Sequence, residues 1–225
     1  MKLGKGVLTK IKPPEIIFVT LILGLINGFI FVFIIPPWEH YDEPGHFEYV
    51  WLIANRLQLP KLGDLDINMR LEMGKSLIQS GFFVRRPSME VNLTDPNQPL
   101  WTGGSQFADP PLYYALDALP LILLRGMPIN TQLYAARVFS LVFFLMTLWA
   151  AYHLLAELTP EKSYLRWLIP LFMALHPALA EYMSSVSDVV GGIGLGVIVG
   201  KMIAVGSNTA ASCFSTGGPA SRMMT

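Results

Sequence analysis

The sequence predicts an all-α integral membrane protein, and three observations support this fold class. Of its 225 residues, 52% are hydrophobic and 14% are charged, with a mean hydropathy of +0.46. A soluble domain carries about 25% charged residues, so this chain is too apolar to be one. Uncharged runs of membrane-spanning length recur along it, and polar sequence rich in proline separates the first run from the next. We therefore expect spanning helices and one large external loop.

Charge and cysteine content exclude two other classes. Lys and Arg together number 16, as do Asp and Glu, so the net charge is zero. A chain without a basic excess offers no surface for phosphates of nucleic acid, and we expect no nucleic-acid partner. Cys213 is the single cysteine, so an internal disulfide framework is excluded.

The first spanning helix is predicted at residues 15–35. The run "IIFVTLILGLINGFIFVFII" provides the roughly 20 apolar residues that cross a bilayer. Lysines precede it, so the positive-inside rule keeps residues 1–14 in the cytoplasm and the protein in the cytoplasmic membrane. A cleaved signal peptide is the alternative, but the run is longer than a signal's apolar region, and "PPWEH" follows it without a cleavage pattern.

Residues 36–130 are predicted to form a large extracytoplasmic loop, because they are polar and rich in Pro and Gly. Its first helix is expected at residues 44–58, since Pro44 suits a first helical turn and apolar residues then recur at helical spacing. Such an amphipathic helix would lie along the outer membrane surface. Asp42 and Glu43 precede it, and capping or dipole partners are one interpretation of this acidic pair.

A second interfacial helix is expected at residues 111–126. The stretch is apolar but short, and Asp117 and Pro120 interrupt it, so we expect it to lie in the interface rather than cross. Tyr113 and Tyr114 would then sit at headgroup level.

Residues 134–158 and 167–187 predict a second and a third span, because both are apolar and of spanning length. The short linker between them holds Lys162 and Arg166, as a cytoplasmic loop does. Asp188 then emerges on the same side as Asp42. If residues 111–126 crossed instead, Asp188 would face the cytoplasm.

The composition changes abruptly after Asp188. Residues 189–205 are long enough for a fourth span, since glycine is tolerated in membrane helices. Residues 206–225 have the composition of a linker, and we expect a disordered or non-native tail there, as in a truncated chain or one with a shifted reading frame.

Three segments resemble landmarks of the GT-C glycosyltransferases, in the branch of protein O-mannosyltransferases and lipid A aminoarabinose transferases. "YDEPGHFEYVWLIANRLQLP" is similar to the motif of their first extracytoplasmic loop, and "DPPLYYALDALPLILLRGMPINTQLYAARVFSLV" to a second landmark, where a helix precedes a span opened by Arg. "LHPALAEYMSSVSDVV" is similar to the segment that follows, more weakly. The resemblance covers residues 15–190 and implies a GT-C-like N-terminal transmembrane module with amphipathic juxtamembrane helices.

The resemblance implies a membrane enzyme that takes a sugar from a polyprenyl-phosphate donor and transfers it, with inversion, to a glycan, lipid or protein acceptor outside the cytoplasm. An inverting transfer needs a carboxylate to accept the acceptor's proton, and Asp42 is the candidate, with Glu43 in support. Other residues that the resemblance assigns to substrate binding are His46, Asp109, Tyr113, Tyr114, Arg137 and Asp188.

The chain departs from this family at Asp109, where members often have Lys, His or Gln before the paired prolines. An ionised Asp cannot neutralise a phosphate, so Arg137 is the nearest substitute, although an Arg at a helix end is also a common membrane anchor. Asp42 and His46, with His40, are candidates to share a divalent metal ion. Alternatively, His46 is an interfacial residue or orients Asp42.

Two other classes remain open. A non-catalytic membrane scaffold or sugar-lipid-binding protein would keep the fold without needing Asp42. A transporter fragment would place its polar groups at the bilayer midplane, often in paired repeats, and no repeat is visible here.

Overall fold

The computed structural model describes residues 13–85, 105–160 and 163–216. Within these ranges all regular secondary structure is helical, without strands, which confirms the predicted all-α class. Most of the predicted cytoplasmic N-terminus, part of the large loop, Lys162 and the last nine residues of the predicted tail lie outside them.

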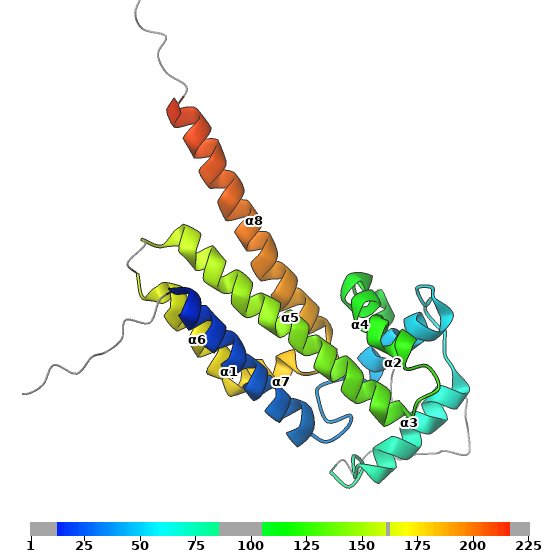
Figure 1. Ribbon diagram of the computed structural model, residues 1–225. Coiled ribbons are helices and arrows are strands. Elements are labelled where there is room, and N and C mark those ends of the chain that lie inside the picture. Colours follow the sequence, from blue (N-terminus) through cyan, green and yellow to red (C-terminus); the bar gives the residue numbers. More distant parts are fainter. Residues whose placement is uncertain (1–12, 86–104, 161–162, 217–225) are drawn as a thin grey trace, which may run out of the picture.

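Three long helices and one short helix run side by side in a bundle (Figure 1): the long ones are α1 (Pro13–Ile34), α5 (Ile129–Leu158) and α8 (Asp188–Thr216), and the short one is α6 (Leu165–Leu175). Glycines let α1 approach α5 closely. A Cβ atom added at Gly24 would lie 2.5 Å from a methyl of Leu148, and one at Gly28 would lie 2.5 Å from a methyl of Leu141. Small residues permit such close packing between helices in membranes.

Two of these helices are long and apolar enough to cross a membrane, at Glu15–Ile34 and Ile129–Leu158. They lie close to the predicted spans at residues 15–35 and 134–158. A third candidate is the sharply bent pair formed by α7 (Pro177–Met183) and the first part of α8, with 111° between the two helices. The chain therefore has the features of a membrane protein, while its sidedness stays a prediction.

The predicted third span, at residues 167–187, is not one continuous helix. It is broken into α6 and α7, because Pro177 follows the extended His176 and a residue before proline is pushed out of the helical region. The predicted tail also differs, since α8 continues through residues 206–216.

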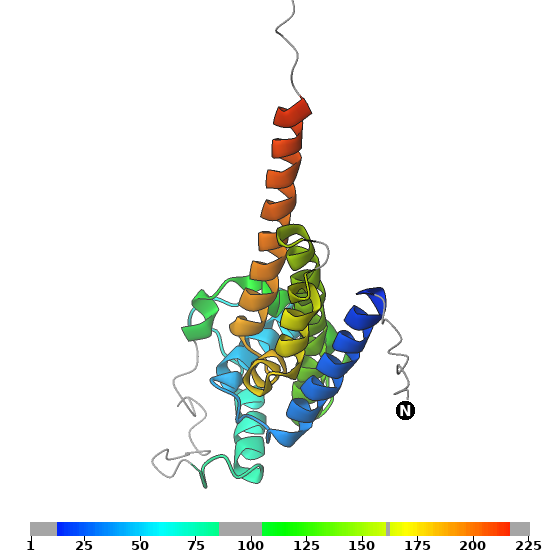
Figure 2. The ribbon, with the colours of Figure 1, turned by 90° about the vertical axis from the view of Figure 1, so that its left-hand side faces the viewer.

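Shorter helices gather at one end of α5 and form a loop module (Figures 1 and 2): α2 (Glu43–Arg56), α3 (Ile67–Gln79), the 3₁₀ turn η1 (Ser105–Ala108) and α4 (Pro111–Leu123). No helix was predicted at α3. Asp66 caps its N-terminus, since the Asp66 side chain accepts a hydrogen bond from the backbone N–H of Met69.

The interpretation of α2 as a helix on the membrane surface is wrong, because nearly the whole helix is buried. The buried carboxylate on its polar face is satisfied by a protein partner instead of by water. The carboxylate of Glu48, 1% exposed, accepts two hydrogen bonds from Arg70 of α3, at 2.6 and 2.9 Å. A bidentate ion pair of this kind satisfies a carboxylate inside a protein.

The predicted position of the α4 tyrosines is also wrong, because Tyr113 and Tyr114 are buried inside the module rather than placed among lipid headgroups. The exposed stripe of α4 consists instead of leucines at helical spacing: Leu112, Leu116, Leu119 and Leu123. With 13 residues, α4 is about 20 Å long, shorter than the roughly 30 Å of bilayer hydrocarbon. It packs against α2 instead.

Candidate functional site

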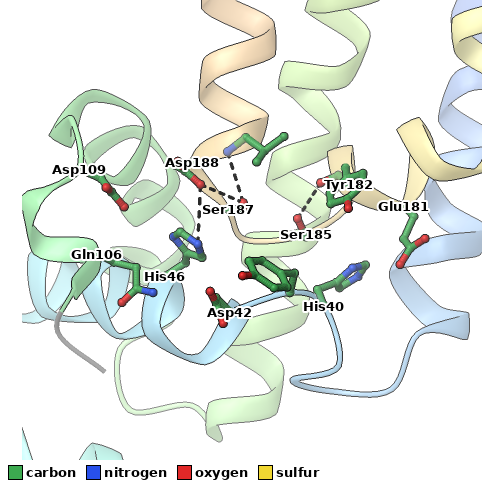
Figure 3. A pocket seen from close by; sticks show the side chains of 12 residues that line it. His40, Asp42, His46, Gln106, Asp109, Glu181, Tyr182, Ser185, Ser187 and Asp188 are labelled. Atoms are coloured by element: carbon green, nitrogen blue, oxygen red, sulfur yellow. Dashed lines mark hydrogen bonds and ion pairs between the residues drawn. The ribbon is translucent and has the colours of Figure 1, made fainter. Parts of the chain in front are cut away.

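A cavity of about 330 Å³ opens where the starts of α2 and α8 meet the segment that precedes α4 (Figure 3). Four of the predicted site residues line it together. They are Asp42, His46, Asp109 and Asp188. Most remaining lining residues are polar: His40, Tyr41, Gln106, Glu181, Tyr182, Ser185 and Ser187, with Val189.

Asp42 stands at the N-terminus of α2 but does not act as a side-chain cap. Its backbone adopts the left-handed conformation, with φ 49° and ψ 15°, and its carboxylate makes no capping hydrogen bond. This conformation is costly for most residues, although Asp tolerates it better than most. The exposed side chain lies at the cavity instead, below His46 in Figure 3. The capping interpretation therefore does not account for the Asp42 carboxylate.

Glu43, the neighbouring acid, is fully buried and is not one of the residues that line the cavity. Its carboxylate accepts hydrogen bonds from Arg137 at 2.6 and 2.8 Å, and from the backbone N–H of Trp38 at 3.2 Å. The side chain thus holds the chain segment before α2 against α5. This position is consistent with the expectation that Glu43 supports the site and does not itself contact the substrate.

Arg137 is fully buried, and all five N–H groups of its guanidinium are used. Besides Glu43, the acceptors are the carbonyls of Val32, Ile35 and Pro36, at 2.9 to 3.1 Å. The carbonyls of Val32 and Ile35 lie at the end of α1, where intrahelical donors run out, whereas the Pro36 carbonyl also accepts the backbone N–H of Glu39 at 3.3 Å. In this conformation Arg137 has no donor left for a phosphate, and its full burial does not fit a membrane anchor. We assign it a structural role.

A chain of polar contacts joins the remaining predicted residues. Nδ1 of His46 lies 2.7 Å from the hydroxyl of Tyr114, and that hydroxyl donates to Asp109 Oδ2 at 3.1 Å. On the other side of the imidazole, Nε2 lies 3.7 Å from Asp188 Oδ1. Residues from three separate parts of the chain thus meet at one histidine.

Burial governs protonation in this cluster. It lowers the pKa of His46 below the usual histidine value, and the surrounding carboxylates, Asp188 first, offset this only in part. It also lowers the pKa of His40 to about 4. Burial, with Asp109 nearby, raises the pKa of Tyr114. Both histidines are therefore neutral and Tyr114 keeps its hydrogen near pH 7.

Tyr113 lies behind the cavity wall and fixes the start of α8. Its hydroxyl lies 3.0 Å from Ser140 Oγ and accepts the backbone N–H of Ser187 at 3.2 Å. A Cβ atom added at Gly191 would lie 2.6 Å from Cβ of Tyr113, so α8 approaches α4 closely there. Tyr113 thus places Asp188 and is too buried to touch a ligand in the cavity.

Some buried polar atoms have no hydrogen-bond partner among the described residues. They are Nε2 of His40, both carboxyl oxygens of Asp117 and Oε1 of Gln132. Burial raises the pKa of Asp117 well above its usual range, which the neighbouring Tyr113 hydroxyl offsets only in part, so this carboxyl is neutral. An uncharged acid is the form that a fully buried site tolerates.

The described lining contains four carboxylates and no Lys or Arg. Within the part of the chain that the structure describes, no three His, Cys, Asp or Glu side chains are arranged to hold a metal ion. The metal candidates Asp42, His46 and His40 therefore line the cavity without forming a coordination set.

Sequence reasoning missed Gln106 and Glu181. Glu181 belongs to the same "LHPALAEYMSSVSDVV" segment as Asp188, and a second carboxylate within that segment was the available signal. Gln106 gave no signal, because it lies in a polar loop of ordinary composition. Only tertiary folding brings it to the cavity.

Comparison of the chain with protein-family models, with curated proteins and with solved structures gives no match. The fold and the site define an α-helical membrane protein with an acidic cavity at one end of its candidate spanning helices.

Proposed function

We propose that this chain carries the donor-side site of a GT-C-like membrane glycosyltransferase, which moves a sugar from a polyprenyl-phosphate carrier to an acceptor hydroxyl or phosphate with inversion. The observation that supports the proposal best is that one cavity gathers Asp42 and Asp188 with His46 and Asp109. A cavity at one end of apolar helices suits a substrate whose polyprenyl tail lies in lipid and whose sugar lies in water. Its volume of about 330 Å³ falls within the range of small-ligand sites, about 300 to 1,000 Å³.

Asp42 is the proposed general base. As an acceptor hydroxyl attacks the anomeric carbon, its O–H bond breaks and the proton passes to the Asp42 carboxylate. The new C–O bond forms on the face opposite the departing phosphate, which leaves with the bonding electron pair. Asp42 suits this role because its side chain is exposed at the cavity and is not used as a helix cap.

The departing lipid phosphate requires positive charge or hydrogen-bond donors. Arg137 does not provide them, since its donors are all used, and no other Arg or Lys lines the cavity among the described residues. Under this proposal the phosphate is therefore neutralised by groups beyond the described lining. The same observation favours the second candidate, a membrane protein that binds sugar lipids without transferring the sugar.

A transfer assay separates the two candidates. The protein is placed in lipid nanodiscs with a panel of radiolabelled polyprenyl-phosphate sugars and a membrane extract as acceptor, and label in the lipid donor and in products is followed. We expect Asp42→Asn to lower transfer by about a hundredfold or more, the usual contribution of a general base. The matched control is Asp64→Asn, at a carboxylate that contacts Arg56 outside the cavity.

Equal transfer by Asp42→Asn and the wild type would exclude Asp42 as the base. Retention of a labelled donor by the wild type without turnover would favour the sugar-lipid-binding protein.

A further inference from the structure

The contacts around His46 define where its hydrogens lie. Tyr114 has one hydroxyl hydrogen and two neighbours, Asp109 Oδ2 at 3.1 Å and His46 Nδ1 at 2.7 Å. An ionised carboxylate can only accept a hydrogen bond, so the tyrosine hydrogen points to Asp109. The short contact with His46 then needs a hydrogen from the imidazole, and Nδ1–H donates to the Tyr114 oxygen.

A neutral imidazole carries one hydrogen, so Nε2 of His46 is left with a free lone pair. The distance between Nε2 and Asp188 Oδ1 agrees with this assignment. At 3.7 Å it is longer than a hydrogen bond, as expected for two acceptors that face each other without a hydrogen between them. The cluster therefore has room for one further proton, between His46 and Asp188.

We propose that Nε2 of His46 is the final acceptor, within the cavity, of the proton that the acceptor hydroxyl loses, with Asp188 balancing the resulting positive charge. This inference rests on the proposed function and adds a second proton-accepting group to Asp42. Tyr114 is a positioning residue, because its hydroxyl fixes the imidazole tautomer and touches no substrate.

Asp42 takes the proton as the acceptor oxygen forms its bond to the sugar, and it passes the proton to Nε2 of His46, which lines the same cavity (Figure 3). The imidazolium then lies between Tyr114 and ionised Asp188, and Asp42 is again a carboxylate, ready for another acceptor. Water removes the proton from His46 when the product leaves.

The charges around His46 favour this uptake. Asp188 at the start of α8, Asp109 before α4 and Asp42 at the start of α2 favour a proton on His46, in that order, and Glu43, which is paired with Arg137, adds the smallest effect. Burial opposes the charge and keeps the imidazole neutral at rest. His46 thus carries no extra proton before the reaction, and the surrounding aspartates stabilise the cation once it forms.

Nitrogen-15 NMR of the histidine-labelled full chain in detergent tests the tautomer without any substrate. The chain has four histidines, and His46→Gln identifies the signals of interest by their loss. We expect neutral His46 with its hydrogen on Nδ1 in the wild type. In Tyr114→Phe the acceptor for that hydrogen is gone, and we expect the hydrogen to move to Nε2, where it can reach Asp188.

The matched control is Tyr49→Phe. The Tyr49 ring stacks on Tyr114 at 4.2 Å between centroids, whereas the His46 Nδ1 contact is made by the Tyr114 hydroxyl, so loss of the Tyr49 hydroxyl should leave the tautomer unchanged. A wild-type His46 with its hydrogen on Nε2, or one already protonated at pH 7, would overturn the proposal, because Nε2 would have no lone pair to accept a proton.

The transfer assay gives the second readout. We expect His46→Gln to lower transfer at least tenfold and to change the dependence of the rate on pH, which a merely structural role would not do. An unchanged pH profile would overturn the proton role of His46. If the wild type transfers no sugar while the tautomer is as expected, the proposed function fails and the proton-accepting geometry stands.

Discussion

Glu43 and Arg137 lie 94 positions apart in the sequence and meet in the fully buried interior through hydrogen bonds of 2.6 and 2.8 Å. Arg137 also binds the carbonyls at the end of α1. The pair therefore joins three elements, α1, α2 and α5, directly beside the residue proposed as the base. The position of Asp42 depends on a contact that no local motif contains.

Loss of this pair should cost far more stability than loss of a surface pair. Arg137→Gln leaves Glu43 buried without its partner, and we expect the free energy of unfolding to fall by about 3 to 5 kcal/mol. The control is Arg85→Gln, whose side chain is 48% exposed and pairs with Glu39, where we expect less than about 1 kcal/mol. Denaturant unfolding in detergent, followed by tryptophan fluorescence, measures both. Equal losses would contradict the structural role of Arg137.

His40 should make folding stability depend on pH. Its pKa is about 4 in the folded chain and 6.5 in the unfolded chain, so between these values only the unfolded chain binds the proton. Stability therefore falls as the pH drops from 6.5 to 4, by roughly 3 kcal/mol at about 1.4 kcal/mol per pKa unit, and this contribution does not fall further at lower pH. Unfolding of the wild type and His40→Gln is compared across this window. Identical slopes in the two proteins would rule out His40 as the cause.

Two adjacent glycines of α8 should respond in opposite ways to the same substitution. Gly191→Ala places a Cβ 2.6 Å from Cβ of Tyr113, and we expect a loss of about 1 to 3 kcal/mol from overpacking. Gly192 has open space at the corresponding position, so Gly192→Ala should be neutral or stabilising by up to about 1 kcal/mol. Thermal unfolding of both variants tests the packing of α8 on α4. A stable Gly191→Ala variant would mean that α8 packs elsewhere.

Topology can be tested with single cysteines in a Cys213→Ser background. The structure places Asp42 and Asp188 at one cavity, while α6, which begins directly after Tyr164, starts at the opposite end of the bundle from α2 (Figure 1). A membrane-impermeant maleimide added to intact cells should label Asp42→Cys and Asp188→Cys but not Tyr164→Cys. Labelling of Tyr164→Cys alone would reverse the predicted sidedness. Labelling of Asp42→Cys without Asp188→Cys, when both label in opened membranes, would contradict the shared cavity.

The candidate spans were the part of the fold that sequence could predict, because length and apolar composition are local properties. Both ends of α1 and the C-terminal end of α5 lie within a few residues of their expected bounds, whereas α5 starts earlier than expected. The prediction of one continuous helix for the third span, at residues 167–187, was wrong for a local reason, the break at His176 and Pro177. Hydropathy averages over such a break, whereas the backbone cannot continue a helix through it.

The surface helix predicted at residues 44–58 shows that a periodic pattern does not identify the tertiary partners of a helix. Apolar and polar residues alternate in it at helical spacing, but the pattern does not say what covers the polar side chains. Arg70 does so, and it belongs to α3, a helix whose polar composition gave little signal. The same holds for the candidate site. Asp42 could be predicted from a sequence motif, whereas the partners of Arg137 are known only from the three-dimensional structure.

Asp188 is the first residue of α8, a helix of 29 residues and so about 44 Å long, which projects well past the end of α5 (Figure 2). Near the cavity α8 packs against α4, and further along it packs against α5, where a Cβ atom added at Gly200 would lie 3.6 Å from Leu154. The carboxylate beside His46 therefore belongs to the same continuous helix that lies along a candidate membrane span, so its position depends on how these two long helices pack together.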